Sequence, residues 1–154
     1  MIIRRAILED MEAIIALRKE IAGYNLQFDA GYTLNVEATE LLHIHITATI
    51  ENSAQCVLVA ESNGAIVGYA NGYLISSPAI FVAQKKGYID ELGIAEASRK
   101  NRIGKAMLDA LIEWFKSQGI EKVELKVDAR NAAGISFWRK NGFGDVQIRM
   151  SKLV

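Results

Sequence analysis

Residues 102–118 predict a helix with one apolar stripe along its length. The apolar residues recur at i, i+3, i+4, i+7, i+8, i+11 and i+12, and they are Ile103, Ala106, Met107, Ala110, Leu111, Trp114 and Phe115. Side chains at this spacing share one side of a helix, so the segment must bury that side and leave the other in water. Segments typical of strands precede and follow it. A sheet is therefore the expected partner, and the chain is expected to fold as a layered α/β protein.

The rest of the chain provides strands and helices for such a fold. Strands are expected at residues 1–7, 56–61, 65–75, 87–94, 120–127 and 143–151, and further helices at about 11–23, 36–50 and 131–141. The order is a strand, two helices, an antiparallel meander and then β–α–β–α–β. This order predicts one α/β domain over residues 1–154 with a mixed sheet. It also argues against a nucleotide-binding fold whose phosphate turn follows the first strand.

Several polar residues and glycines predict where these elements start, end or bend. Asp10 is the expected N-cap of the first helix, and Gly23 is expected to mark its end. The Asn-Gly pair at residues 63–64 favours the positive φ angles of a tight hairpin. Gly68 and Gly72, inside the following strand, indicate a bulge or a close approach of another element.

Composition excludes several classes of protein. The 18 basic and 18 acidic residues cancel, so no overall field would attract nucleic acid or an anionic membrane. No apolar run approaches the roughly 20 residues that a membrane span needs, and the acidic N-terminal segment does not resemble a signal peptide. The one cysteine, Cys56, rules out an intrachain disulfide and is expected to be a buried hydrophobe. We expect a cytoplasmic protein that binds neither nucleic acid nor membrane.

The turn before the long helix is unusually basic. It contains Arg99, Lys100, Arg102 and Lys105, with Gly104 just inside the helix. The first amides of a helix have no internal partner, and the helix dipole places partial positive charge there, so such a turn can bind phosphate. The alternative is a solvated loop whose charges only maintain solubility.

Two segments together resemble the GNAT superfamily of N-acetyltransferases, and the resemblance covers nearly the whole chain. The family signature, Gln/Arg-x-x-Gly-x-Gly/Ala, aligns with residues 99–104, where Arg99 and Gly104 match and Arg102 replaces the first glycine. Downstream, residues 131–143 resemble the family's Asn-x-x-Ala-x-x-x-Tyr-x-x-x-Gly-Phe pattern, with Trp138 at the tyrosine position. The resemblance implies a mixed sheet of six to seven strands flanked by about four helices.

The resemblance also implies acetyl-CoA as co-substrate and a set of residues that bind it. In the family, amides of the fourth strand hold the acetyl carbonyl and pantetheine where the fourth and fifth strands splay apart, and amides of the turn hold the pyrophosphate. Carried onto this sequence, the binding residues are Leu92, Gly93, Ile94, Arg99, Lys100, Asn101, Arg102, Ile103, Gly104, Lys105, Asn131 and Trp138. Gly93 is the expected position of a bulge in the strand.

Two adjacent carboxylates are the candidate catalytic bases. Glu91 is our first choice and Asp90 our second, and strand alternation is expected to place them on opposite faces of the sheet. Either one could instead form an ordinary surface ion pair. The indole of Trp138 can donate a hydrogen bond to a thiolate but is not a useful acid, and Tyr73 and Tyr88 are possible substitutes.

The implied activity is transfer of an acetyl group from acetyl-CoA to a primary amine of a small molecule or a protein, directly within a ternary complex. The alternative is an acyl-CoA-binding sensor or partner module without turnover. The acceptor is expected to contact residues 24–50 and 76–86, where carboxylates and aromatic rings are available for a cationic amine: Tyr24, Phe28, Asp29, Tyr32, Glu37, Glu40, His43 and His45. We expect no metal site. The apolar segment 143–154 makes a homodimer possible.

Overall fold

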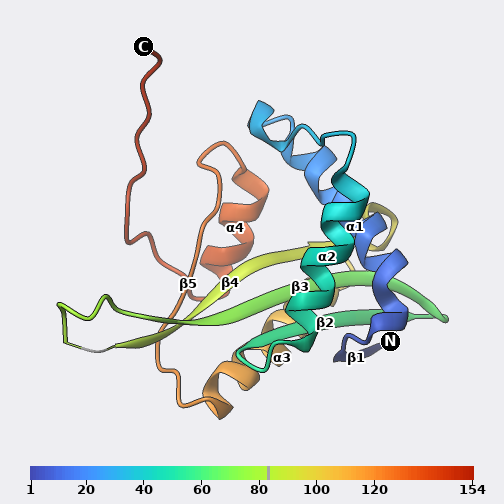
Figure 1. Ribbon diagram of the computed structural model, residues 1–154, viewed down its shortest axis with the longest axis horizontal. Coiled ribbons are helices and arrows are strands. Elements are labelled where there is room, and N and C mark those ends of the chain that lie inside the picture. The colour runs from blue at the N-terminus through green and yellow to red at the C-terminus, as the bar shows by residue number, and fades with distance from the viewer. Residues whose placement is uncertain (83) are drawn as a thin grey trace.

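A mixed five-stranded sheet runs through the computed structural model, which describes residues 1–82 and 84–154 (Figure 1). Its strands follow the order of the chain: β1 (Ile2–Arg5), β2 (Gln55–Ser62), β3 (Ala65–Ser76), β4 (Lys85–Ile94) and β5 (Val123–Leu125). The first four pair antiparallel, whereas β5 pairs parallel to β4. The α/β class and the mixed sheet are therefore confirmed.

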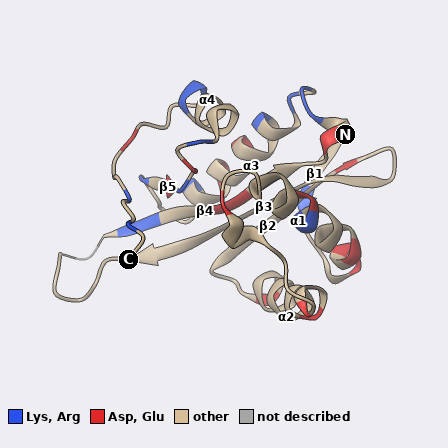
Figure 2. Ribbon diagram, turned by 90° about the horizontal axis from the view of Figure 1, so that it is seen from above, with Lys and Arg blue, Asp and Glu red and all other residues tan. Residues whose placement is uncertain are grey.

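Helices cover both faces of the sheet. They are α1 (Met11–Asn25), α2 (Ala38–Glu51), α3 (Ile103–Ser117) and α4 (Ala132–Lys140), with short 3-10 turns at Leu8–Asp10, Ala30–Tyr32 and Glu96–Ser98. Figure 2 shows α2 and α3 on opposite sides of the sheet. No helix within residues 1–82 and 84–154 has the length and apolar character to cross a membrane.

Each face of the sheet has its own apolar core because β2 is buried on both sides. Cys56, Leu58 and Ala60 pack with α3, while Val57 and Val59 pack with α1 and α2. This alternation follows from the period-2 geometry of a strand. The expected burial of Cys56 is confirmed, with 1% of the residue exposed.

The apolar face of α3 packs directly against glycines of the sheet. Phe115 is fully buried, and a Cβ atom at Gly72 would lie 2.7 Å from its Cζ atom. At Gly87 a Cβ atom would lie 2.5 Å from Phe115 Cδ1. Both distances are too short for carbon atoms, so the helix can approach the sheet only because these positions lack side chains. The expected close approach at Gly68 and Gly72 is confirmed, since a Cβ at Gly68 would lie 2.6 Å from the sulfur of Met107. The hairpin at 63–64 is also confirmed, with positive φ at both residues.

The expected strand at 143–151 is wrong. Within the described chain, residues 143–154 form no strand, and the expected strand at 120–127 is reduced to Val123–Leu125. The sheet therefore has five strands rather than six to seven. Alternating apolar residues make a strand possible, but a strand exists only where a neighbour completes its hydrogen bonds, and the pattern does not encode that neighbour.

Asp10 has a different role from the expected helix cap. It occupies the N-cap position of α1 without a side-chain capping bond. Its carboxylate instead accepts hydrogen bonds from Arg4 Nη1 at 2.7 Å, Arg4 Nη2 at 2.9 Å and the amide of Ile7 at 2.9 Å. The hydrogen bond to Arg4 lowers the pKa of Asp10 below its ordinary value. The expected end of α1 at Gly23 is two residues early, because the helix continues to Asn25.

We predict that Asp10→Asn lowers the free energy of unfolding by about 2 kcal/mol at neutral pH, because it removes charge-assisted hydrogen bonds from a buried group. A lowered pKa in the folded state means that this stabilisation is present above the ordinary value of 3.8 and is lost as the pH falls through the lowered value. Urea titrations of the wild type and the variant measure this effect. The difference between their free energies of unfolding should be smaller well below pH 3.8 than at neutral pH. Asp109→Asn, which removes only the exposed pair with Lys105 on α3, should cost less than about 0.5 kcal/mol at either pH.

Candidate functional site

Strand β4 loses one of its two neighbours halfway along its length. It pairs with β5 at Gly87, Tyr88 and Ile89, and β5 then ends at Leu125 while β4 continues to Ile94. The splay implied by the family resemblance is therefore present. From residue 90 onward, the edge of β4 that faces away from β3 has no strand beside it in the described chain.

The hydrogen-bond register decides which amides face this open edge. The amide of Ala95 donates to Val67 O at 2.9 Å, so residues 95, 93 and 91 point their peptide groups toward β3. Leu92 and Ile94 alternate with them and point their peptide groups into the gap. Of the three residues expected to hold an acyl chain, Leu92 and the amide of Ile94 are thus available. The carbonyl of Ile94 already accepts from Arg99 Nε at 3.1 Å, and Gly93 is engaged with β3.

A bulge changes the direction of the two candidate carboxylates. Asn71 pairs with Glu91 and the next residue, Gly72, pairs with Ile89, which leaves Asp90 without a partner in the ladder. The bulge is therefore at Asp90 rather than at Gly93. It also overturns the expectation of opposite faces. Glu91 pairs with Asn71, which shares the α1 and α2 face of β3 with Tyr69 and Tyr73. Asp90 lies two residues after Tyr88, the partner of Tyr73, so the bulge leaves both carboxylates on that face.

Glu91 forms a partly buried ion pair with Arg18 of α1. Arg18 Nε lies 2.9 Å from Glu91 Oε2, and each side chain is 18% exposed. Burial raises the pKa of Glu91, and the positive charge of Arg18 opposes that rise. The guanidinium also lies over the ring of Tyr69, 5.8 Å from its centroid. Among the described residues, Arg18 Nη1 and Asn71 Oδ1 are buried without a hydrogen-bond partner.

Arg18 is a residue of this candidate site that the sequence motifs did not identify, although the sequence contains a signal for it. Arg18 falls on the apolar face of α1 with Ile14, Ile15 and Ile21, where its alkyl stem alone fits the pattern. A cation at a core-facing position needs a buried counter-charge. That requirement points to a carboxylate on the sheet below the helix.

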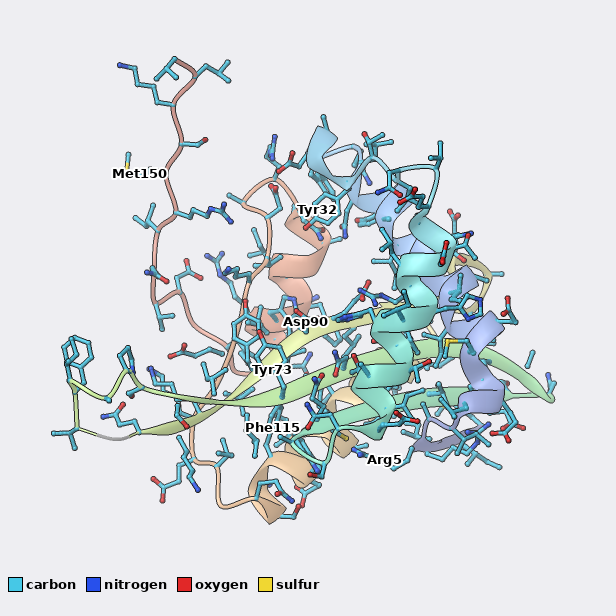
Figure 3. The ribbon with its side chains drawn as sticks, in the orientation of Figure 1. Arg5, Tyr32, Tyr73, Asp90, Phe115 and Met150 are labelled. Carbon is cyan, nitrogen blue, oxygen red and sulfur yellow. The ribbon has the colours of Figure 1, made fainter. Side chains whose placement is uncertain are left out.

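Asp90 is exposed, and its charge acts on two tyrosines and a histidine. Burial is the main cause that raises the pKa of Tyr73 and Tyr88, and the charge of Asp90 adds to it. The two tyrosine rings are 5.3 Å apart. Burial and Arg18 lower the pKa of His45 on α2, against the opposite effect of Asp90. Figure 3 shows Asp90 and Tyr73 close together beside α2.

A pocket next to Arg18 and His45 opens between α1, α2 and the loop that joins these helices. Its volume is about 380 Å³. Its lining residues are Arg18, Thr33, Leu34, Asn35, Ala38, Leu41, Leu42 and His45. Arg18 and His45 thus connect the pocket to the two carboxylates, in the part of the chain expected to contact an acceptor.

Other residues of segment 24–50 that were expected to contact an acceptor do not line this pocket. Tyr24 lies under Arg99, 5.0 Å from the guanidinium carbon to the ring centroid, and packs edge-on against Phe28. Asp29 caps a 3-10 turn by accepting from the amide of Gly31, and His43 pairs with Glu12. Tyr24 thus contacts the basic turn, and Asp29 and His43 have local partners, whereas the charge of Asp90 acts on His45.

The basic turn before α3 has an unusual backbone. Lys100 and Arg102 have φ angles of 69° and 59°, in the left-handed region, and α3 begins at Ile103. No side-chain capping bond forms at the start of α3 among the described residues. Its first amides therefore remain available for an anion.

The cations of the turn divide into two groups. Arg99 Nε donates to Ile94 O at 3.1 Å, and Lys105 forms an ion pair with Asp109 farther along α3. Their side chains are thus used within the protein. Lys100 and Arg102 are exposed, so their side chains remain for a ligand or solvent.

The turn lies close to both β4 and α4. A Cβ atom at Gly104 would lie 3.6 Å from Phe137 Cε2 and 3.7 Å from Leu92 Cδ2, so the position has room for a methyl group. Asn131 caps α4 by accepting from the amide of Gly134 at 2.9 Å. Trp138 packs between Phe137 and Phe143, with ring centroids 5.0 and 5.3 Å away. Asn131 and Trp138 therefore have structural roles in α4.

The arrangement combines a helix N-terminus with free amides, an open strand edge, and two carboxylates on the side of α1 and α2. The chain matches the Acetyltransferase (GNAT) family model over residues 20–143. It therefore belongs to the acetyltransferase (GNAT) family, as the sequence resemblance indicated.

Similar proteins support this assignment. An N-alpha-acetyltransferase of Sulfurisphaera tokodaii is 32% identical over 58% of this chain and 57% of its own length. A tetramutant of the BH1408 protein from Bacillus halodurans shares the fold, with a TM-score of 0.90, 23% identity and complete coverage of both chains. A predicted acetyltransferase with acetyl-CoA from Clostridium acetobutylicum is 25% identical, with a TM-score of 0.78, over 99% of this chain and 95% of that one. The chain spans less than two thirds of the length of the curated relatives it matches.

We predict that Arg102→Gly stabilises the protein by about 0.5–1 kcal/mol. A left-handed conformation costs a residue with a side chain roughly 1–2 kcal/mol, and the greater freedom of glycine in the unfolded chain offsets part of the gain. Asn101→Gly is the matched control, since the φ of Asn101 is not positive, and it should destabilise. Thermal and urea unfolding measure both changes. Equal destabilisation by the two variants would contradict the assigned backbone conformation.

Proposed function

We propose that this protein transfers the acetyl group of acetyl-CoA directly to a primary amine of a small molecule or a protein within a ternary complex. The observation that carries the proposal is the structure of β4. Its open edge presents Leu92 and Ile94 beside the N-terminus of α3, and its bulge turns Asp90 and Glu91 toward the acceptor pocket. The single strand β4 would thus contact both acetyl-CoA and the amine.

The diphosphate of acetyl-CoA would bind at the first amides of α3. The exposed cations of Lys100 and Arg102 are placed to add charge-assisted contacts. The pantetheine chain would lie along the open edge of β4, where the peptide group of Leu92 and the amide of Ile94 can pair with its amide groups. Arg99 has a positioning role, because it ties the turn to β4 and to Tyr24.

The acceptor would approach from the α1 and α2 side as a cationic amine. Asp90 supplies an exposed negative charge, and the rings of Tyr73 and Tyr88 lie beside it. Carboxylates and aromatic faces both attract ammonium groups. A lowered pKa keeps His45 neutral at neutral pH, so it adds no repulsive charge.

The chemical step follows from these positions. Glu91 takes one proton from the ammonium, and the amine nitrogen then attacks the thioester carbon. The carbon–sulfur bond breaks, the departing thiolate of coenzyme A takes the second proton that the nitrogen must lose to become the amide, and Glu91 passes its proton to solvent. The raised pKa of Glu91 makes it a better base than an ordinary exposed carboxylate. The thiolate is a weak base and can leave without an acid. The alternative of an acyl-CoA sensor without turnover is not favoured, because similar proteins are named as acetyltransferases.

We predict different kinetic effects for the two carboxylates. Release of free thiol with a panel of polyamines, aminoglycosides, amino acids and peptides would identify an acceptor. Glu91→Gln should then lower kcat by about 100-fold, the usual range for loss of a general base. Asp90→Asn should mainly raise the KM for the amine. Glu113→Gln, an exposed residue of α3, is the control and should leave both constants unchanged. If neither site variant lowers kcat/KM by about tenfold, the base lies elsewhere.

We predict that Arg18→Gln moves the acidic limb of the kcat/KM profile to higher pH. Arg18 lowers the pKa of Glu91, so its removal raises that pKa, and the base then becomes protonated at a higher pH than in the wild type. The pH–rate profiles of the wild type and the variant measure the shift. An unmoved limb would show that Glu91 is not the titrating base.

A further inference from the structure

The pocket between α1 and α2 contains few polar groups that the protein does not already use. Thr33 Oγ1 donates to a nearby carbonyl at 2.7 Å, and Asn35 Oδ1 accepts from an amide two residues ahead at 2.9 Å. The guanidinium of Arg18 and the imidazole of His45 remain for a ligand. Within the described part of the chain, no carboxylate lines the pocket.

The rest of the pocket lining is apolar. It consists of Leu34, Ala38, Leu41 and Leu42. The volume of about 380 Å³ lies at the small end of the range for small-molecule pockets, roughly 300–1,000 Å³. The pocket therefore suits a small ligand with one apolar branch. A second ammonium group would meet these apolar side chains and the charge of Arg18, so a polyamine is a poor match.

Arg18 has a spare donor beside the candidate base. Its Nε atom lies 2.9 Å from Glu91 Oε2, while its Nη1 atom is buried without an acceptor among the described residues. A buried donor without an acceptor is costly, so a ligand that brings an oxygen atom to this guanidinium is favoured. A carboxylate is the best match, because its hydrogen bond to a guanidinium is charge-assisted.

The amide oxygen of Asn71 provides a complementary group for an amine. Asn71 is 2% exposed and lies opposite Glu91 in the ladder between β3 and β4. Among the described residues, its Oδ1 atom has no donor. An ammonium group can donate three hydrogen bonds, so Asn71 Oδ1 and the carboxylate of Glu91 can bind the same ammonium.

The contact between Arg18 and Glu91 limits the distance between the two charged groups of the acceptor. Because these side chains lie 2.9 Å apart, a carboxylate at Arg18 and an ammonium at Glu91 must be close together in the ligand. In an α-amino acid both groups are attached to one carbon. A long diamine or an amino acid with its amine at the far end does not have this arrangement.

We propose that the acceptor is a free α-amino acid with an apolar side chain such as that of leucine. Its carboxylate binds Arg18, its ammonium lies between Asn71 and Glu91, and its side chain enters the pocket between α1 and α2. The product is then an N-acetyl amino acid. This inference rests on the proposed function, since it names the amine that receives the acetyl group. A peptide N-terminus has only a neutral carbonyl group at the position of the carboxylate.

The first test measures binding without acetyl transfer. Isocaproate has the side chain and the carboxylate of leucine but no amine, so it cannot be N-acetylated. Calorimetry with the full chain, with coenzyme A present or absent, should show that isocaproate binds about tenfold more tightly than isocaproamide, which has no charge for Arg18. No binding of isocaproate, or equal binding of the acid and the amide, would overturn the proposal.

A variant pair places this binding in the pocket. Ala38→Trp fills the space between the leucines and should abolish binding of isocaproate. Glu40→Trp adds the same side chain at an exposed position of α2 that does not line the pocket, and it should bind isocaproate as the wild type does. Unchanged binding by Ala38→Trp would show that the ligand lies elsewhere, which would overturn the proposal.

The second test compares acceptors by the release of free thiol. Leucine should have a kcat/KM about 10- to 100-fold higher than isoamylamine, which lacks the carboxylate. Leucine should also be preferred to the dipeptide leucyl-glycine. A preference for isoamylamine would overturn the role of the carboxylate, and a preference for leucyl-glycine would overturn the free amino acid in favour of a peptide N-terminus.

Arg18→Lys tests the specificity role of Arg18 separately from its pairing with Glu91. Lysine keeps a positive charge beside Glu91 but lacks the forked donors of arginine, so the KM for leucine should rise about tenfold. The kcat/KM for isoamylamine should stay within about twofold of the wild-type value. A merely structural role of Arg18 would lower the activity toward both amines equally, and that result would overturn the assignment.

The two tests distinguish a failure of this inference from a failure of the proposed function. If no amine releases thiol but isocaproate binds in the pocket, acetyl transfer is wrong and the specificity of the pocket for an apolar carboxylate is supported. If other amines are acetylated and leucine is not, acetyl transfer is supported and the amino acid assignment is overturned.

Discussion

The loss of pairing between β4 and β5 after Ile89 is the constraint on which the site depends. A strand with two neighbours uses every peptide group in the sheet and has none left for a ligand. Here β4 keeps its neighbour on one side as far as Ile94, so it stays rigid, while its other edge is open. The turn that follows β4 then delivers the N-terminus of α3 to the end of that edge. An extended polar ligand can therefore bind to backbone groups that are already held in place.

The bulge at Asp90 places two carboxylates on the same strand. Without it, alternation would send one carboxylate toward α3 and into the apolar core. With it, Asp90 and Glu91 both face α1 and α2. Arg18 then becomes necessary, because a partly buried Glu91 without a counter-charge would be costly. The pair keeps Glu91 available as a carboxylate in an environment that otherwise favours its neutral form.

Local patterns in the sequence predicted most of the elements. The stripe of α3 required a sheet, and the glycines at 68 and 72 correctly indicated where a helix approaches it. The basic turn and the second segment identified the family, and the matching family model confirms it. The left-handed φ of Arg102 explains why glycine is usual at that position, which the pattern alone did not explain.

The sequence by itself determined the fold class, the family and the positions of the helices and of most strands, because these depend on periodicity and turn chemistry over a few residues. The tertiary structure decided which strand edges are free, where the bulge lies and that Arg18 meets Glu91. It also decided that residues 143–151 have no strand beside them in the described chain. Each of these features depends on pairing between distant segments, and hydrogen-bond register is set only when those segments come together.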